Sequence, residues 1–393
     1  MRLVPLSIAM VVFASAGCAQ NVTIDLKNQF ITQDMQTLVP HIGGRMLAKT
    51  LPAPMPAGAI SYVHEWPAIY FEADFTGENI FLKFDDPANE YRVLIDDLAP
   101  LTLAQPGTSE VAINGLKDGP HHIRLEKVTE SAWIIGSFDG FYMPKGAQGD
   151  AAQPRPRQIE FIGDSDMTGY GIRSTSRTCT QEEVRLLSDA QIGYPALLAK
   201  ALDADYQLNA ISGRGLIRNY GGTNVQDAMI YAYPDILPDV GAGVVTRPYS
   251  DPNWKPQIIV IAIGENDFST PLLAGEKWES NDALIDDFIR ASTSFLQTLY
   301  KTNPNAAVIM MKFDAPILTE TEKSRMAYAQ ENTLQNTARA TGFRMVNLVS
   351  IEALAYDQSA CHYHASTADQ QRRADWLADY IRADPEFWDQ KQP

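Results

Sequence analysis

The sequence predicts two domains: a β-sandwich, then an α/β domain in which helices cover both faces of a mainly parallel, five-stranded sheet. The chain has 393 residues, whereas single hydrophobic cores stop growing at about 250–300 residues. From Leu38 to Met143, short β-rich runs are separated by turn residues, without a helical period. After Arg157, apolar strands alternate with amphipathic helices, which is typical of a parallel sheet between helical layers.

Residues 1–17 are expected to form an export signal. A charged residue, an apolar run and a small-residue cleavage site follow one another, in Arg2, Leu3–Phe13 and Ala14–Ala16. The sequence up to Cys18 also has the form of a bacterial lipobox, although Ser15 stands where Leu is usual, so a lipid anchor at Cys18 stays open. We therefore expect a secreted or periplasmic protein, or an outer-membrane lipoprotein, of a bacterium. Residues 18–37 would form an N-terminal extension.

The sandwich is expected over residues 38–145 and a linker over residues 146–156. Within the sandwich, β-rich runs lie between Gly, Pro, Asn and Asp residues. The linker is rich in Gly, Ala and Gln and contains two prolines, as domain boundaries often do. The clearest strand candidates are Ala68–Phe75, Ile80–Phe84, Tyr91–Ile95 and His121–Lys127.

The α/β domain is expected over residues 157–386. Apolar residues from Phe288 to Leu299 recur at helical spacing and predict a helix packed on the sheet. A last helix is expected over Thr367–Ala383. The expected strands are Gln158–Ile162, Tyr206–Ala210, Gln257–Ile263, Ala307–Lys312 and Arg344–Leu348.

Charge and cysteine content narrow the partners and the compartment. Acidic residues outnumber basic ones by 48 to 32, giving a formal net charge of −16, and no run of Lys and Arg interleaves with aromatic residues. Nucleic acid is therefore not an expected partner. Past the leader, no stretch is long and apolar enough to span a bilayer. In an oxidising compartment we expect Cys179 and Cys361 to form a disulfide; two unpaired buried thiols are the alternative.

Four short segments of the α/β domain contain the residue types of a serine esterase. A serine acts as a nucleophile when a base takes its proton and hydrogen-bond donors await the oxyanion. Three of the segments directly follow expected strands, whose carboxyl ends share one edge of a parallel sheet. Each segment alone is weakly specific. They are Gly163–Ser165, Ile211–Gly215, Ile263–Phe268 and, ahead of the last helix, Cys361–His364.

The order and positions of these segments resemble the SGNH (GDSL-type) hydrolases. The resemblance implies that Ser165 is the nucleophile and His364 the base. It also implies an oxyanion hole formed by the backbone N–H groups of Ser165 and Gly213 and the side chain of Asn266. The chemistry implied is acyl transfer through an acyl-enzyme intermediate. The Gly-x-Ser-x-Gly elbow of α/β-hydrolases is absent around Ser165, which separates the two hydrolase folds.

The resemblance narrows to carbohydrate esterase family 2. It implies an amino-terminal jelly roll and a secreted enzyme that removes O-acetyl groups from acetylated xylan, mannan or their oligosaccharides, without a metal or other cofactor. The similar segments in the second domain are Gly169–Gly171, Ser212–Gly215, Arg218–Tyr220 and Asn266–Ser269. Those in the first domain are Gly44–Arg45, Asn114–Leu116, Gly119–His121 and Lys127–Glu130.

One departure from the pattern concerns the group that orients the base. Many SGNH hydrolases have an Asp three residues before the His, where this sequence has Cys361, and some family 2 enzymes have an Asp two residues before it, where this sequence has His362. Without a carboxylate, the Nδ1 proton needs another acceptor, such as a main-chain carbonyl. We therefore predict a dyad of Ser165 and His364. Two alternatives stay open: His362 is the base, or Asp357 folds back to orient His364.

Tyr363, Arg214 and His362 are the candidates for substrate contact. Tyr363 stands where the family often has Trp, so its ring could support a sugar; a core tyrosine is the alternative. For Arg214, the alternative is a brace within its own loop. Asp164 and Asp267 adjoin proposed catalytic residues, and we interpret them as structural hydrogen-bonding groups rather than as the carboxylate pair of a glycosidase.

Two other functions stay open at this point. The missing carboxylate is compatible with a non-catalytic or weakly active carbohydrate-binding protein, for which tight sugar binding without turnover is expected. A lipid or thioester hydrolase on the same fold is the other alternative, and its activity would rise with acyl length.

Overall fold

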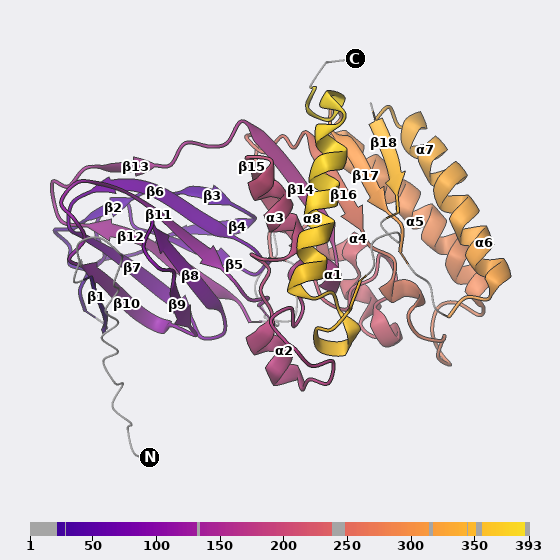
Figure 1. Ribbon diagram of the computed structural model, residues 1–393, viewed down its shortest axis with the longest axis horizontal. Helices are drawn as coiled ribbons and strands as arrows, with labels where there is room; N and C mark the ends of the chain where they lie inside the picture. The colour runs from indigo at the N-terminus through magenta and orange to yellow at the C-terminus, as the bar shows by residue number, and fades with distance from the viewer. Residues whose placement is uncertain are drawn as a thin grey trace. The chain divides into compact units, whose positions relative to one another are not determined.

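The computed structural model describes residues 22–27, 29–131, 134–237, 248–313, 317–343, 345–350 and 356–389. The expected export signal and Cys18 lie outside the described residues. The chain divides into two compact units (Figure 1). Of the described residues, those up to Glu65 and those in Ile69–Pro154 form the first unit, while Trp66–Ala68 and those from Arg155 onward form the second.

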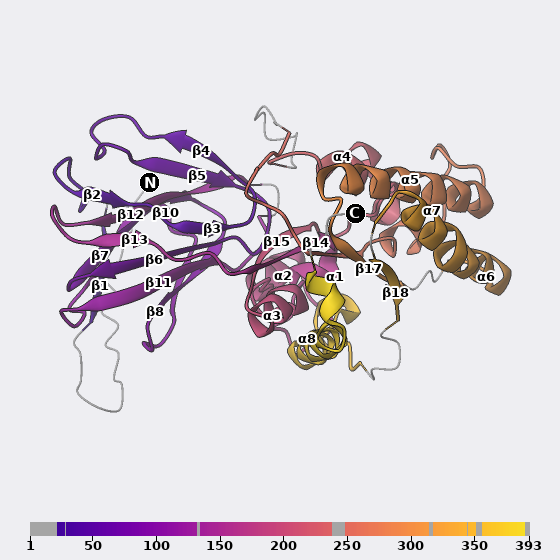
Figure 2. The same cartoon turned by 90° about the horizontal axis from the view of Figure 1, so that it is seen from above.

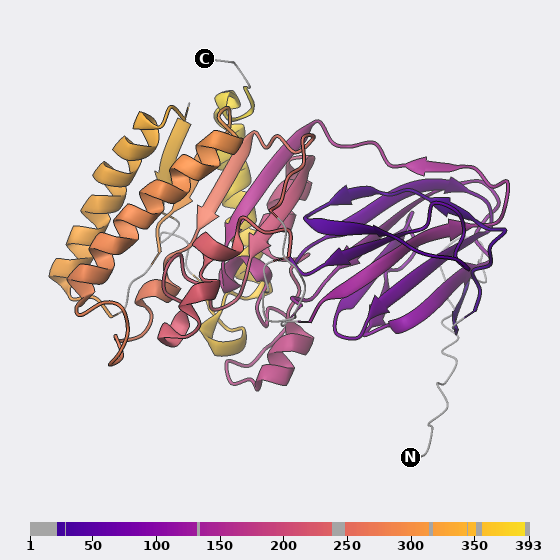
Figure 3. The same cartoon turned by 180° about the vertical axis from the view of Figure 1, so that it is seen from behind.

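The first unit is a sandwich of two antiparallel sheets, which confirms the predicted β-sandwich (Figures 1 and 3). One sheet has the order β1-β10-β7-β12-β5-β4 with β2 paired to β12, and the other has the order β13-β6-β11-β8-β9 with β3 paired to β6. The bounds are β1 (Thr23–Lys27), β2 (Gln36–Leu38), β3 (His41–Gly43), β4 (Met46–Thr50), β5 (Ile60–His64), β6 (Tyr70–Thr76), β7 (Asn79–Asp86), β8 (Glu90–Ile95), β9 (Leu101–Ala104), β10 (Gly107–Asn114), β11 (Pro120–Lys127), β12 (Gly136–Met143) and β13 (Gly149–Ala151).

Aromatic side chains form the centre of the sandwich core. The ring of Phe138 lies 4.6 Å from that of Phe71, 5.4 Å from that of Phe84 and 4.8 Å from that of Phe141, between centroids, and all four residues are fully buried. Such pairs contribute about 0.5–1.5 kcal/mol each beyond the area that they bury. The sandwich therefore has a hydrophobic core of its own.

One expected strand begins later than predicted. The run Ala68–Phe75 was expected to be extended throughout, but β6 starts at Tyr70. Ala68 has φ = 55°, a left-handed conformation that interrupts extended backbone.

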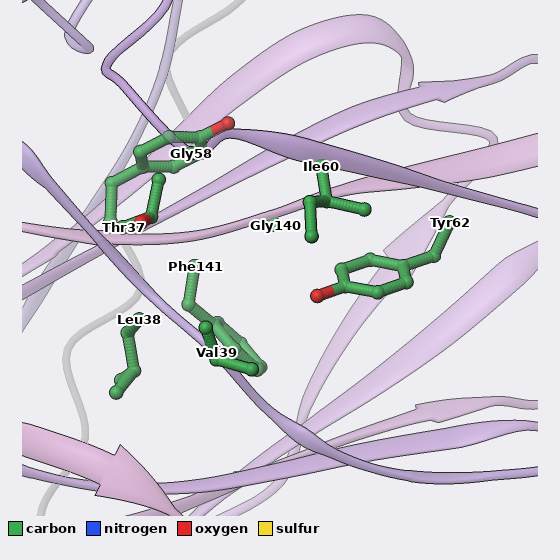
Figure 4. Close-up of a pocket in the computed structure, with 9 residues that line it drawn as sticks. Thr37, Leu38, Val39, Gly58, Ile60, Tyr62, Gly140 and Phe141 are labelled. Carbon is green, nitrogen blue, oxygen red and sulfur yellow. The ribbon is translucent and has the colours of Figure 1, made fainter. Parts of the chain in front are cut away.

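A small recess in the sandwich provides little room for a ligand (Figure 4). Its volume is about 10 Å³, which is the space of about one water molecule. It is therefore a local gap in the packing rather than a binding pocket. Its lining residues are Thr37, Leu38, Val39, Gly58, Ile60, Tyr62, Gly140, Phe141 and Tyr142.

The second unit contains a five-stranded parallel sheet in the order β15-β14-β16-β17-β18, as predicted. Because β14 lies between β15 and β16, the chain leaves it toward one side and later returns to the other. Open α/β sheets bind ligands at such a switch point, beyond the carboxyl ends of the strands. The bounds are β14 (Arg157–Gly163), β15 (Ala204–Ala210), β16 (Ile258–Ala262), β17 (Ala307–Met311) and β18 (Met345–Val349).

Helices cover both faces of this sheet, with α3 and α8 on one face and α5 and α7 on the other (Figure 2). The last expected helix is α8, which ends one residue before the predicted bound. Among the described residues, no helix has the length and apolar character needed to cross a bilayer. The bounds are α1 (Ser165–Thr168), α2 (Gln181–Leu187), α3 (Tyr194–Ala201), α4 (Met229–Ala232), α5 (Asn281–Thr302), α6 (Glu320–Tyr328), α7 (Gln335–Ala340) and α8 (Thr367–Arg382).

Candidate active site

Ser165 lies directly beyond the carboxyl end of β14, at the switch point of the sheet. Asp164 caps the one-turn helix α1, whose first residue is Ser165. A Cβ atom at Gly163 would lie 2.5 Å from Sδ of Met167 and 2.7 Å from the carbonyl oxygen of Ala262. Glycine is therefore required for α1 to approach β16 this closely.

Ser165 and His364 meet, although 199 positions separate them in the sequence. Nε2 of His364 lies 2.9 Å from Oγ of Ser165, and Nδ1 lies 3.0 Å from the carbonyl oxygen of Cys361. A carbonyl can only accept, so Nδ1 carries the proton of the neutral ring and Nε2 is left to accept the Ser165 hydroxyl proton. This geometry is that of a general base beside a nucleophile.

The surroundings of His364 favour the neutral imidazole. Burial lowers the pKa of His364 below its usual 6.5, and the Asp166 carboxylate opposes that effect. The ring of Tyr170 stacks on the imidazole, with the centroids 4.3 Å apart and the planes 29° apart. At neutral pH the base is consequently unprotonated and ready to accept a proton.

The structure supports neither of the alternatives for the base and its orienting group. Both ring nitrogens of His362 are engaged elsewhere, Nδ1 with the hydroxyl of Tyr170 at 3.0 Å and Nε2 with the carbonyl oxygen of Cys179 at 2.9 Å. The carboxylate of Asp357 accepts the backbone N–H of Ser359 at 3.0 Å. The acceptor for Nδ1 of the base is the main-chain carbonyl of Cys361.

Gly213 places its backbone beside open space, as an oxyanion donor requires. Its φ is 76°, and a Cβ atom there would meet nothing within 4 Å. Its carbonyl accepts the backbone N–H of Tyr220 at 2.9 Å, which fixes the orientation of the turn. No partner for the backbone N–H of Gly213 or of Ser165 occurs in the described part of the chain.

Asn266 lies where the sequence predicts it, but its amide is already occupied. Nδ2 donates to Oδ2 of Asp164 at 3.1 Å and to the carbonyl oxygen of Arg214 at 2.9 Å. A primary amide has two hydrogens, so both are used. Donation to an oxyanion therefore requires one of these bonds to be shared or released.

Asp164 and Asp267 have the structural roles expected for them. The carboxylate of Asp267 accepts the backbone N–H groups of three consecutive residues, Leu216 at 2.7 Å, Ile217 at 2.9 Å and Arg218 at 2.9 Å. Burial raises the pKa of Asp267 to about 7, although the hydrogen bonds from these three N–H groups lower it. Burial also raises the pKa of Asp164 well above its usual range, and the nearby charges of Glu265 and Asp166 add to the effect.

Arg214 and Arg218 brace the loop between β15 and α4. Arg214 is buried and its guanidinium lies 3.5 Å from Oδ2 of Asp227, which favours the bracing role over substrate contact. The fully buried Arg218 donates to the Glu276 carboxylate at 2.6 and 2.9 Å and to the carbonyl oxygen of Asp267 at 3.0 Å. Sequence reasoning missed this role of Arg218, because Glu276 is 58 positions away.

A second group that the sequence did not reveal lies beside Ser165. Oδ2 of Asp166 accepts a hydrogen bond from Nη1 of Arg373 at 2.9 Å, and Gln370 donates to the Asp166 carbonyl at 2.9 Å. The guanidinium of Arg373 lies over the rings of Tyr194 and Tyr356, at 5.0 and 5.2 Å from their centroids. The signal in the sequence that could have indicated this group is the Asp that directly follows Ser165.

Tyr363 is exposed rather than part of the core. Its relative exposure is 65%, and the guanidinium of Arg177 lies 4.8 Å from the centroid of its ring. Two residues before it, Cys361 is joined to Cys179 by a disulfide. Tyr363 therefore presents an aromatic surface one residue from His364.

Comparison with known proteins identifies the family of each unit. The family model for the carbohydrate esterase 2 N-terminal domain matches residues 58–152, and the model for the GDSL-like lipase/acylhydrolases matches residues 159–389. An acetylxylan esterase/glucomannan deacetylase of Cellvibrio japonicus is 39% identical over 350 residues, which are 88% of this chain and 92% of that protein. The chain belongs to carbohydrate esterase family 2.

Solved structures of family 2 enzymes share the fold. One, a carbohydrate esterase described as having divergent catalytic and non-catalytic binding functions, is 37% identical, with a TM-score of 0.79 over 90% of this chain and all of that one. Another, a family 2 esterase of Clostridium thermocellum in complex with cellohexaose, is 24% identical and has a TM-score of 0.68 over 88% of this chain and all of that one. As a family 2 carbohydrate esterase, this protein is a carboxylic ester hydrolase.

Proposed function

We propose that this family 2 esterase removes O-acetyl groups from acetylated polysaccharides or oligosaccharides, with Ser165 as nucleophile and His364 as base. The observation that carries the proposal is the bond between Oγ of Ser165 and Nε2 of His364, at 2.9 Å, with the Nδ1 proton of His364 fixed by the Cys361 carbonyl. The name of the Cellvibrio relative, which covers acetylxylan and glucomannan, supports acetylated xylan and mannan as the substrate class.

In the first half-reaction, Oγ of Ser165 attacks the acetyl carbonyl while its proton passes to Nε2 of His364. The carbonyl oxygen becomes an oxyanion and accepts hydrogen bonds from the backbone N–H groups of Ser165 and Gly213, joined by the Asn266 amide. On collapse of the tetrahedral intermediate, the imidazolium returns the proton to the sugar oxygen. The sugar leaves as an alcohol and the acetyl group stays on Ser165.

In the second half-reaction, water attacks the acetyl-enzyme and His364 takes the water proton. Collapse releases acetate, and the proton returns to Oγ of Ser165. The carbonyl of Cys361 keeps the imidazole oriented but contributes less than a carboxylate would to stabilising the imidazolium.

The exposed ring of Tyr363 is proposed to support a sugar ring next to the reacting ester. Aromatic faces suit the apolar faces of sugars, and the cation–π contact with Arg177 fixes the orientation of this one. We also propose that the protein is exported from the cell, because its substrate is a polymer and residues 1–17 have the pattern of an export signal. In the alternative form of this proposal, the exported protein stays attached to a membrane through a lipid on Cys18.

A binding role without turnover is the second candidate, and the state of Asn266 favours it. An amide that stays bonded to Asp164 and Arg214 would leave the oxyanion with two backbone donors. A protein of this kind would hold acetylated carbohydrate and hydrolyse it slowly or not at all.

The test is acetate release from acetylated xylan, acetylated glucomannan and an aryl acetate. Wild type would be compared with Ser165→Ala, His364→Ala and His362→Ala. We expect near-complete loss in the first two variants and partial loss in the third, whose ring only braces the loop. Retention of most activity in Ser165→Ala would refute the proposal.

Two further results would favour a different function. An inactive wild type that still binds the acetylated polymers would favour the binding role. Activity that rises with acyl length along a series of aryl esters would indicate a lipid or thioester hydrolase instead.

A further inference from the structure

The segment that carries His364 contains two successive non-glycine residues with left-handed backbone. His362 and Tyr363 have φ of 53° and 65°, in the left-handed region that non-glycine residues seldom occupy. Two such residues in succession persist only where the surrounding structure holds them. They lie between Cys361, whose carbonyl orients the imidazole, and His364 itself.

The surrounding structure that holds them is the loop formed by residues 174–180. The carbonyl oxygen of Arg177 accepts the backbone N–H of His362 at 2.8 Å, and that of Cys179 accepts Nε2 of His362 at 2.9 Å. The guanidinium of Arg177 donates to the carbonyl oxygens of Asp357 at 2.7 Å and Gln358 at 2.9 Å. The 174–180 loop thus contacts the base-carrying segment on both sides of Cys361.

The loop has internal braces that make it a defined support. Oγ of Ser174 accepts the backbone N–H of Ser176 at 3.0 Å, and Oγ of Ser176 accepts that of Thr178 at 3.1 Å. The side chain of Thr180 then begins α2 with a capping box. The loop therefore has a fixed shape that it can impose on the segment beside it.

Cys361 is the residue at which these contacts converge. Its sulfur is bonded to that of Cys179, and its carbonyl oxygen accepts Nδ1 of His364 at 3.0 Å. The residue is fully buried, and a Cβ atom at Gly171 would lie 2.4 Å from its Cβ, so glycine is needed to admit it. One residue therefore links a covalent anchor to the orientation of the base.

We propose that the 174–180 loop and its disulfide to Cys361 position the His364 imidazole through the carbonyl of Cys361. The proposal rests on the assignment of His364 as the base. Cys179 and Cys361 act through His364, so they are positioning residues. Cleavage of the disulfide would leave the carbonyl of Cys361 less firmly placed, and the imidazole with it.

The experiment compares the oxidised full chain with the same protein reduced by dithiothreitol and with Cys179→Ser. In the reduction, the dithiol gives two electrons and two protons, closes to its cyclic disulfide and leaves two protein thiols. Cys179 is only half-buried, so the reagent has access from that side. The readouts are kcat and KM on an aryl acetate, and the NMR titration of the His364 ring.

We expect kcat to fall by about tenfold to a hundredfold, the scale of loss for a catalytic group displaced by about 1 Å. KM on the small substrate should change little. The titration midpoint of His364 should move up toward about 6.5, because a loosened ring is better solvated. The charged or titratable groups around the ring are Asp166, which is held by Arg373, His362, and Tyr170, whose ring stacks on the imidazole.

Two variants separate positioning from general loss of stability. Val308→Ala removes fully buried volume from β17 and should lower Tm without moving the His364 titration. Arg177→Met removes the bonds to the carbonyl groups at 357 and 358 but keeps the disulfide, so it should give a smaller loss of kcat than Cys179→Ser. Dithiothreitol should have no effect on Cys179→Ser.

Unchanged kcat and an unchanged His364 titration on reduction would overturn the proposal. So would a Val308→Ala variant of equal Tm loss that moved the titration as far as Cys179→Ser does. If the oxidised wild type hydrolyses no ester, the proposed function fails, and the NMR titration alone then decides whether the loop positions the ring.

Discussion

Replacing Asn266 by alanine tests whether its occupied amide still serves the oxyanion. Removal of one oxyanion donor costs about 3 kcal/mol of barrier when the donor is already aimed at the oxyanion. Here both amide hydrogens are bonded, to Oδ2 of Asp164 at 3.1 Å and to the carbonyl oxygen of Arg214 at 2.9 Å. Giving up one such bond costs about 1 kcal/mol.

The net contribution of Asn266 to transition-state stabilisation is therefore about 2 kcal/mol, or about a 30-fold loss of kcat in Asn266→Ala. KM should change little, because the effect arises in the transition state. The variant also removes two hydrogen bonds to buried acceptors, so the free energy of unfolding should fall by about 2 kcal/mol.

Steady-state kinetics on an aryl acetate, with thermal unfolding measured in parallel, provide the assay. Asn209→Ala is a matched control, because Asn209 is likewise a buried asparagine and its side chain donates to Glu160 at 2.8 Å. It should lose stability and keep kcat. A loss of kcat below about threefold in Asn266→Ala would show that the amide never reaches the oxyanion. A loss above about a hundredfold would show that it is aimed there in advance. Either result would refute the inference that Asn266 releases one of its two hydrogen bonds in order to donate to the oxyanion.

Three further substitutions have defined outcomes. Asp166→Asn removes a negative charge that raises the pKa of His364, so the acidic limb of the kcat/KM profile should move to lower pH. Gly171→Ala places a Cβ atom 2.4 Å from that of Cys361, so kcat and Tm should both fall. Tyr363→Ala should raise KM for acetylated oligosaccharides by up to about tenfold and leave KM for an aryl acetate unchanged.

Each of these substitutions has a control in the same chain. Asp375→Asn removes an exposed carboxylate from α8 and should leave the pH profile in place. Gly107→Ala imposes similar backbone strain, at φ = 60°, where a Cβ atom meets nothing within 4 Å, and should keep kcat. Tyr231→Ala removes another exposed ring, of 58% relative exposure. Equal effects in variant and control would contradict the assigned role.

The elements around the site could be predicted because their signals are local. The strand β14 and the turn after it follow from an apolar run ending in Gly163, and the switch-point position of Ser165 follows from the parallel order of the strands. The placement of Asn266 beyond β16 follows in the same way. What its side chain binds could not be predicted, because Arg214 and Asp164 come from two other loops.

The sequence analysis named a main-chain carbonyl as an acceptor for the Nδ1 proton, but which carbonyl orients His364 could not be predicted, for a related reason. The acceptor is a main-chain carbonyl, which every residue has, so no residue type marks it. Its position depends on the left-handed backbone of His362 and Tyr363, a conformation that non-glycine residues seldom adopt. The ion pair of Asp166 with Arg373 spans 207 positions, and only the complete fold brings these residues together.

The separation of the two bonded cysteines has a consequence for biogenesis. The disulfide closes a span of 182 positions, and the chain-entropy account gives a cross-link over a span of that size about 5 kcal/mol of stabilisation. Strands β15 to β18 all lie within the closed span. Ser165 is thus synthesised before this span and His364 after it, so a nascent chain holds the serine before the histidine that contacts it. The hydrogen bond between Ser165 and His364 can form only once residues 361–364 have emerged, and oxidation of Cys361 against Cys179 then closes the span around the intervening strands.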